Sequence, residues 1–160
     1  MLDGQDELTA FVEWESPNAP TYCHATEPIC IVGDAAHATT PWAGAGFGSA
    51  IEDVLVLDTV LGRCDSAGDI KTAFEAFDAV TRTRSQQIVG TSHGTGLIVN
   101  GFEGLQIKQM QATLANRYDF IWYYDHVGEI AEAAENVERI KRLANAQRRA
   151  DMRRKMQVVA

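Results

Sequence analysis

The sequence predicts a mainly helical chain with one or two short strands, and three observations support this fold class. Three long segments, beginning near residues 49, 69 and 127, place apolar residues at the three- and four-residue spacing of an amphipathic helix. One run, residues 29–32, has the β-branched composition of a strand. Residues 1–28 and 34–48 are rich in Pro, Gly, Ala or polar residues, which is typical of loops.

The composition of the 160-residue chain suits one domain with an apolar core, because 46% of its residues are hydrophobic. Its net charge of -8 argues against a general nucleic-acid binder, since an acidic surface repels phosphate groups. Residues 139–155 nevertheless hold eight of the fourteen basic residues and a single acid, Asp151. We interpret this segment as a solvated basic helix end; an anionic docking site is the alternative.

The sequence shows no sign of export or membrane insertion. Cys23, Cys30 and Cys64 are few and odd in number, so we expect reduced thiols and no structural disulfide. The first ten residues lack the basic and apolar parts of a secretory signal, and no apolar run is long enough to span a membrane. We therefore expect a soluble, cytoplasmic chain.

Residues 29–32 read Ile-Cys-Ile-Val, apolar on both faces, and stop at Gly33. This pattern predicts a short strand buried within a sheet. Because at most one or two other strand candidates are present, we expect its neighbours to be missing from this chain. The preceding residues, with apolar positions such as Phe11, Val12 and Trp14, are expected to form a loop.

The first predicted helix runs from Ser49 to about Gly62. Ile51, Val54 and Leu55 keep helical spacing, and we expect this helix to be largely buried. Glu52 and Asp53 would lie in its first turn, where the helix dipole favours acids.

A second helix is predicted to begin at the N-cap Asp69 and to run for about five turns through a stripe that ends at Arg84 and Ile88. Gly90, Gly94 and Gly96 weaken its end, and another helix is expected within residues 103–116. Five aromatic residues between positions 118 and 124 predict a packing plug in preference to a binding cage. A last helix, from about Val127, ends in the basic segment.

The chemistry is expected between residues 29 and 61. Asp34 follows the predicted strand directly, so its carboxylate would lie where ligands bind at the carboxyl edge of a sheet and could accept hydrogen bonds from a polyol. Gly44, Gly46 and Gly48 precede a helix whose free N–H groups suit an anionic or electron-rich ligand atom.

This segment resembles the GD motif of the group A flavoprotein monooxygenases, in which a strand ends in Gly-Asp and is followed by Ala-Ala-His, a proline and a glycine-rich turn into a helix. The matching residues are Gly33, Asp34, Ala35, Ala36, His37, Pro41, Gly44, Gly46, Glu52 and Asp53. Trp42 and Ala43 stand where members often have other residues. The resemblance implies FAD as cofactor and a parent fold of the α/β FAD/NAD(P)-binding type.

The resemblance also implies roles for individual residues. Asp34 would bind the ribityl hydroxyls, Pro41 would lie beside the isoalloxazine ring, and the turn at residues 45–48 would face the N1/O2 edge of the flavin. No residue is assigned as catalytic. The expected cofactor-binding residues are Gly33, Asp34, Pro41, Gly44, Ala45, Gly46, Phe47 and Gly48.

A weaker resemblance to fungal salicylate hydroxylase-like members rests on residues 74–86, with Arg82 and Arg84, and on residues 117–125. It implies three regions: residues 1–28 as the end of a substrate-domain region and a connection, 29–62 as the FAD-binding strand, GD loop and helix, and 63–160 as a C-terminal helical region. The implied reaction is hydroxylation of a salicylate-like aromatic ring with NAD(P)H and O2, without nucleic-acid or membrane partners.

The chain lacks the G-x-G-x-x-G turn and the Asp-Gly motif of these enzymes, so we expect it to be a fragment, inactive by itself. Two alternatives remain open. One is a non-catalytic helical interaction protein derived from such an enzyme, and the other is a related flavin reductase or dehydrogenase.

Other residues that could carry chemistry receive structural interpretations. His37 is expected to be structural and to bind neighbouring backbone groups, with an acid/base role as the alternative. Cys23, His24, Cys30 and His37 lack the spacing of a zinc site, so no metal is expected. A hydrolase triad of Ser49, His37 and Asp34 is rejected because Ser49 is not in G-x-S-x-G. His93 and His126 have no identifiable partner.

Overall fold

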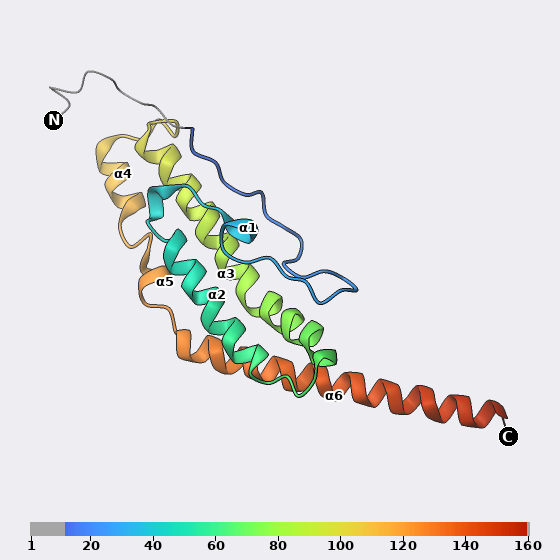
Figure 1. Ribbon diagram of the computed structural model, residues 1–160. Coiled ribbons are helices and arrows are strands. Elements are labelled where there is room, and N and C mark those ends of the chain that lie inside the picture. Colours follow the sequence, from blue (N-terminus) through green and yellow to red (C-terminus); the bar gives the residue numbers. More distant parts are fainter. Residues whose placement is uncertain (1–11, 160) are drawn as a thin grey trace, which may run out of the picture.

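A computed structural model describes residues 12–159, and over this range the chain is a helical assembly with a long extended segment at its start (Figure 1). The expectations for Phe11 and for the first ten residues lie outside the described range. The elements in order are α1 (Asp34–His37), η1 (Pro41–Ala43), α2 (Gly46–Leu61), η2 (Ala67–Asp69), α3 (Ile70–Val99), α4 (Ile107–Leu114), α5 (Asp119–Trp122) and α6 (His126–Val159). The predicted mainly helical fold class is confirmed.

The core lies where α2, α3 and α6 meet. Helices α2 and α3 run antiparallel, and α6 crosses their lower ends before it extends away from them (Figure 1). Small and β-branched side chains fill the junction, which lets the three helices approach closely. The buried residues at this junction are Val56, Val60, Ala73, Ala76, Phe77, Ala133 and Val137.

The extended segment before α1 is anchored to α3 through Tyr22, which is only 1% exposed. Its hydroxyl lies 2.8 Å from Ser85 Oγ, and its backbone N–H donates to Asp78 Oδ1 at 2.7 Å. Gln86 Nε2 donates to the carbonyl of Ala19 at 2.6 Å. The loop expected for this region is therefore irregular in conformation but firmly bound.

The prediction of a buried strand at residues 29–32 is wrong for the described chain. Its only β-type pairing within residues 12–159 is an isolated antiparallel bridge between Cys23 and Cys30. Ile29 is 58% exposed, and Ile31 and Val32 are exposed as well. An apolar extended segment becomes a buried strand only when neighbouring strands pair with it, and among the described residues only the short stretch around Cys23 does so.

The first predicted helix is confirmed as α2, but its burial was predicted on the wrong face. Ser49, Asp53, Val56 and Val60 point into the core. The apolar stripe that predicted the helix is exposed instead, since Phe47, Ile51, Val54 and Leu55 all face outward. Because α2 begins at Gly46, Glu52 and Asp53 lie beyond its first turn and do not serve the helix dipole there.

Helix α3 begins after Asp69 as predicted, but the Asp69 side chain does not cap it, because Oδ2 accepts hydrogen bonds from the backbone N–H groups of Asp65 and Ser66 instead. The helix then continues without interruption through its glycines to Val99. Two of these glycines make room for neighbours. A Cβ on Gly96 would lie 2.5 Å from Trp42 Nε1, and a Cβ on Gly94 would lie 2.6 Å from Arg117 Nη2. Close packing of these two side chains against the helix offsets the weak helix propensity of glycine.

The aromatic run at residues 118–124 is only partly the predicted packing plug. Trp122 and Tyr123 are exposed, whereas Tyr118, Phe120 and Tyr124 are half-buried. Tyr118 donates to Thr95 Oγ1 and to the carbonyl of Trp42, both at 3.1 Å. No helix in the described part of the chain is long and apolar enough to cross a membrane.

Candidate functional site

The loop between residues 33 and 45 is held from below by one carboxylate of α2. Asp53 Oδ2 accepts hydrogen bonds from the backbone N–H of Gly33 and from His37 Nε2, both at 2.8 Å. Burial alone would lower the pKa of His37, but the hydrogen bond and the charge of Asp53 outweigh it, so the pKa is raised. His37 is thus structural, as predicted, although its partner is a carboxylate and not the neighbouring backbone.

The second half of the loop is held by α3. Ser92 Oγ donates to the carbonyl of Thr40 at 2.5 Å and accepts the backbone N–H of Ala43 at 3.1 Å. The indole of Trp42 lies against Gly96, directly beside this hydroxyl. Together with Asp53, Ser92 therefore fixes η1 and the position of Pro41 from two separate helices.

The opposite side of the loop is open. Asp34 and Pro41 are exposed, and the carboxylate of Asp34 forms no hydrogen bond with the described residues. A Cβ built on Gly44 or on Gly48 would meet nothing within 4 Å, and Gly44 has a φ of 62°, which side chains rarely adopt. A flat ligand could therefore approach the backbone here more closely than at an ordinary loop.

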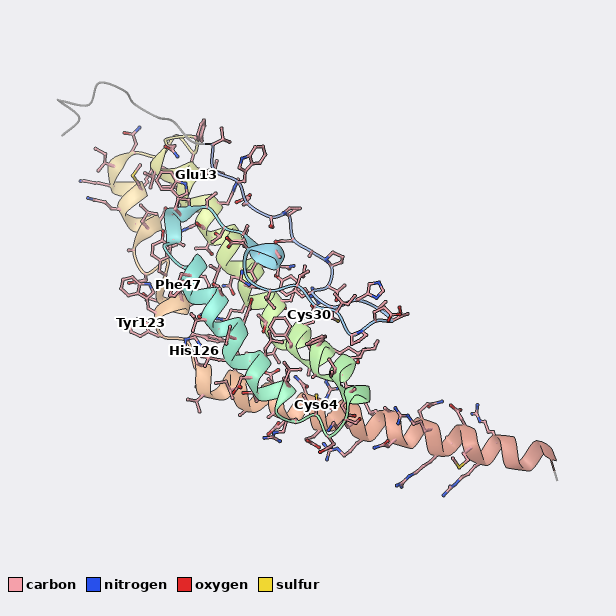
Figure 2. The ribbon with its side chains drawn as sticks, in the orientation of Figure 1. Glu13, Cys30, Phe47, Cys64, Tyr123 and His126 are labelled. Carbon is pink, nitrogen blue, oxygen red and sulfur yellow. The ribbon has the colours of Figure 1, made fainter. Side chains whose placement is uncertain are left out.

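The N-terminus of α2 faces the same open side. Its N-cap is Ala45, and no side chain caps the first turn. Phe47, labelled in Figure 2 near the start of α2, is 83% exposed. The free N–H groups and positive dipole end of this 16-residue helix are thus available to an electron-rich ligand atom.

The structure leaves five of the eight expected cofactor-binding residues exposed: Asp34, Pro41, Gly44, Phe47 and Gly48. Gly33 and Gly46 are half-buried and Ala45 is buried, so these three can contribute only backbone groups.

A second polar cluster, which the sequence interpretation did not predict, lies on the other side of α2. Arg84 Nε and Nη2 donate to the two oxygens of Glu52 at 2.8 and 2.9 Å. Arg84 Nη1 donates to the carbonyl of Phe120 at 3.0 Å, and its guanidinium carbon lies 3.5 Å from the centre of the Tyr124 ring. This single side chain ties α2, α3 and the segment before α6 together.

Glu129 and His126 extend this cluster into α6. Burial raises the pKa of Glu129, since the opposing hydrogen bond of Tyr124 does not offset it, and the charge of Glu52 adds to the rise. Burial and the charge of Glu129 raise the pKa of Tyr124 to about 12. The sequence indicated no partner for His126 or His93, but the structure gives both acidic neighbours. His126 lies 3.8 Å from Glu52 and 3.8 Å from Glu129. Outside this cluster, His93 Nδ1 lies 2.9 Å from Glu15.

Glu52, His126 and Glu129 could in principle form a metal site, because one ligand atom of each lies within 4.8 Å of the others. However, both oxygens of Glu52 already accept hydrogen bonds from Arg84, whose positive charge would repel a cation placed there. The geometry therefore fits a network of ion pairs and hydrogen bonds that joins three helices.

Comparison with known proteins shows the family to which the chain belongs. The FAD binding domain family matches residues 6–92. Salicylate hydroxylase of Pseudomonas putida is 34% identical over 118 residues, which cover 71% of this chain and 27% of that protein. The 6-methylsalicylate 1-monooxygenase atA of Aspergillus terreus is 50% identical over 64 residues, or 40% of this chain and 14% of that protein.

A solved structure, a salicylate hydroxylase substrate complex, aligns with a TM-score of 0.63 and 32% identity over 72% of this chain and 29% of that chain. The chain therefore belongs to the FAD-dependent aromatic monooxygenases that resemble salicylate hydroxylase. It spans about a third or less of the length of these relatives.

The cofactor of this family is FAD, and the open loop fits part of it. The exposed carboxylate of Asp34 suits polyol hydroxyls, the empty space above Gly44 and Gly48 suits a flat ring, and the uncapped α2 suits the electron-rich edge of that ring. Asp53 and Ser92 escaped the sequence interpretation as supports of this loop, and Arg84 escaped it as an anchor of α2, because each contacts residues far away in the sequence.

Proposed function

We propose that this chain supplies the flavin-contacting loop and the C-terminal helices of an FAD-dependent hydroxylase that acts on a salicylate-like aromatic ring. The observation that carries the proposal is the pairing of a rigidly supported underside with an open upper face in residues 33–48. A loop that only connected two elements would not need Asp53 and Ser92 to fix it from two helices.

Each exposed residue of the loop has a separate role in this proposal. Asp34 accepts hydrogen bonds from the ribityl hydroxyls, and Pro41 lies beside the isoalloxazine ring. The backbone N–H groups of Phe47 and Gly48 face the N1/O2 edge, where the α2 dipole stabilises negative charge. Gly33, Gly44, Ala45 and Gly46 allow the backbone to pass close to the cofactor.

The cofactor supplies the redox chemistry, in which FAD reduced by NAD(P)H uses O2 to place one oxygen atom on the ring. The names of two relatives, salicylate hydroxylase and 6-methylsalicylate 1-monooxygenase, favour a phenolic acid as substrate. Neither the described loop nor the helices provide a side chain that we assign to the chemical step. The contribution of this chain is to position FAD and to stabilise negative charge on its ring.

The apolar stripe of α2 is exposed in this chain and indicates a further part of the enzyme that covers it. Phe47, Ile51, Val54 and Leu55 lie on this face, and the extended residues 29–32 are exposed too. Apolar groups in such numbers on one face mark a contact with further polypeptide. We propose that residues 29–62 complete an FAD-binding sheet of a longer enzyme, that residues 1–28 connect to its substrate domain, and that residues 63–160 form its C-terminal helical region.

The direct test is a titration of the 160-residue chain with FAD, followed by flavin fluorescence and by thermal stability. Asp34→Ala should abolish or strongly weaken the binding. Asp58→Ala is the matched control, because Asp58 is an equally exposed acid on α2 but lies away from the loop.

The possible results distinguish the proposal from its alternatives. Binding that Asp34→Ala removes and Asp58→Ala retains supports the flavin role of the loop. A folded chain that ignores FAD argues for a non-catalytic helical interaction protein. If a longer parent binds FAD but its oxygen uptake does not respond to salicylate-like substrates, a flavin reductase or dehydrogenase replaces the hydroxylase.

A further inference from the structure

Helix α6 separates its charges along its length. Its first part carries Glu132, Glu135 and Glu138, and the part after residue 138 carries eight basic residues and the single acid Asp151. The first part and Ile140 pack against the core at α2 and α3, whereas the rest of the second part extends away from them into solvent (Figure 1). The basic half of α6 is thus a helix whose described side chains are largely exposed.

The opposite charges share one face of α6. Residues Glu135, Glu138, Arg142, Arg149 and Arg153 follow one another at intervals of three, four, seven and four, which keeps them on one side of a helix, and all are exposed. The core residues of α6, including Ala133 and Val137, point the other way. Two shallow depressions, which meet at Arg142, line this face.

Glu135 and Glu138 are too far from Arg149 and Arg153 to pair with them within one helix. Glu138 and Arg149 are about 16 Å apart along the axis, since each residue adds about 1.5 Å. Glu138 has one weak partner, Arg63 at 3.9 Å, and Arg149 and Arg153 form no ion pair with the described side chains. The face therefore presents an acidic half and an unpaired basic half.

We propose that α6 docks antiparallel on α6 of a second copy of this chain, so that Glu135 and Glu138 of each copy face Arg149 and Arg153 of the other. A two-fold axis at the level of Ala144 produces both sets of pairs at once, because residues 138 and 149, and residues 135 and 153, are placed symmetrically about it. Asn145 and Ala146 lie near the axis and permit close approach. Such a helix pair is small and charged, so the dimer is weak and sensitive to salt.

A second copy fits these observations better than an anionic polymer does. The chain outside residues 139–155 holds 21 of the 22 acidic residues, so it would repel a polyanion while it attracts the basic half of another copy. The acidic part of α6 also supplies the matching charges in register, which a polyanion would not use.

The test is sedimentation velocity of the 160-residue chain and of charge-reversed variants. The unaltered chain should dimerise in about 50 mM NaCl, and its dissociation constant should rise about tenfold or more in about 500 mM NaCl. The double variant Arg149→Glu with Arg153→Glu should be monomeric, and so should Glu135→Arg with Glu138→Arg. Mixing these two double variants should restore a dimer, since the face of one then carries four acids beside Arg142 and the face of the other carries only bases.

A matched control changes the same charges on other sides of the same helix. Arg148→Glu with Arg154→Glu should dimerise as the unaltered chain does, and circular dichroism should show the same helix content for all variants. A monomeric chain in low salt overturns the proposal. So does a dimer that ignores all the reversals, which would indicate association through the apolar stripe of α2, or a mixture of the two reversed variants that stays monomeric.

Discussion

His37 Nε2 lies 2.8 Å from Asp53 Oδ2, and both side chains are almost completely removed from solvent. The same carboxylate oxygen accepts the N–H of Gly33, so one buried acid of α2 holds both ends of the turn that displays Asp34. This arrangement makes the shape of the loop depend on the folding of the helix pair beneath it.

Replacing Asp53 should therefore destabilise the fold by more than the loss of a small side chain would. Asp53→Ala leaves a buried histidine and a backbone N–H without their acceptor, and we expect the free energy of unfolding to fall by about 3–5 kcal/mol. Asp53→Asn keeps an acceptor but loses the charge, so its effect should be smaller. Urea unfolding followed by circular dichroism measures both.

Asp58→Ala is the control for this series, since Asp58 is exposed on the same helix. It should change the free energy of unfolding by no more than about 0.5 kcal/mol. Equal effects of Asp53→Ala and Asp58→Ala would contradict the role of Asp53 as the anchor of the loop.

The raised pKa of His37 predicts how stability depends on pH. Folding increases proton affinity at His37, so its contribution is fully present below its ordinary pKa of 6.5 and is lost as the pH rises through the higher folded value. The free energy of unfolding should therefore decrease over this interval in the unaltered chain. In His37→Gln this part of the pH dependence should vanish.

His93→Gln provides the comparison, because His93 also faces an acid, Glu15, but is half exposed. Its pH profile shows the effect of replacing a half-exposed histidine, with which the loss in His37→Gln is compared. An unchanged slope in His37→Gln would show that the titrating group is another one.

Lysine should not be able to replace Arg84 without a loss of stability. A lysine ammonium cannot donate in parallel to both oxygens of Glu52 and also reach the carbonyl of Phe120, so Arg84→Lys should destabilise the fold by about 2 kcal/mol. Arg82→Lys, in a more exposed pair with Asp78, should cost at most about 0.5 kcal/mol. Thermal unfolding of the two variants measures both losses of stability. Similar losses would contradict the role of Arg84 as the side chain that joins α2, α3 and the segment before α6.

Gly96 should be intolerant of even one methyl group. The Cβ of Gly96→Ala would lie 2.5 Å from Trp42 Nε1, so the Trp42 indole must move, and we expect η1 and Pro41 to move with it. We expect a changed tryptophan emission, a lower melting temperature and an affinity for FAD reduced by about tenfold.

Gly90→Ala is the matched substitution in the same helix, because nothing lies within 4 Å of its Cβ. It should stabilise α3 by about 0.5–1 kcal/mol and leave the emission and the FAD affinity unchanged. If both variants behaved like Gly90→Ala, the packing of Trp42 on α3 would not control the loop.

The sequence predicted the features that depend on local pattern, such as helices and turn motifs. It did not predict the burial or the partners of residues whose contacts lie far away in the sequence. Helical spacing predicted α2 but placed its start at Ser49, three residues after Gly46, and α3 begins directly after Asp69 as predicted. The family resemblance of residues 33–48 is confirmed because a motif of turn residues is itself local. The burial of residues 29–32 was predicted wrongly, since apolar composition indicates a preference for burial and not the presence of a neighbour.

The supports of the site show the same limit. Asp53 and Glu52 are adjacent in sequence, yet they bind different partners. Asp53 binds His37, 16 residues earlier, and Glu52 binds Arg84, 32 residues later. Helical periodicity places adjacent residues on different sides of α2, but it cannot name the partners. Likewise, nothing in the local pattern around Tyr22 indicates that it would be one of the most buried side chains.

The exposed stripe of α2 begins at Phe47, in the same turn whose free N–H groups face the open loop. Any polypeptide that covers this stripe must therefore also fix the helix end that a ligand would contact. The two binding events are then thermodynamically linked, and each should strengthen the other by the same factor. A cofactor would therefore bind more tightly when the neighbouring surface is in place, and its affinity would measure how complete the assembly is.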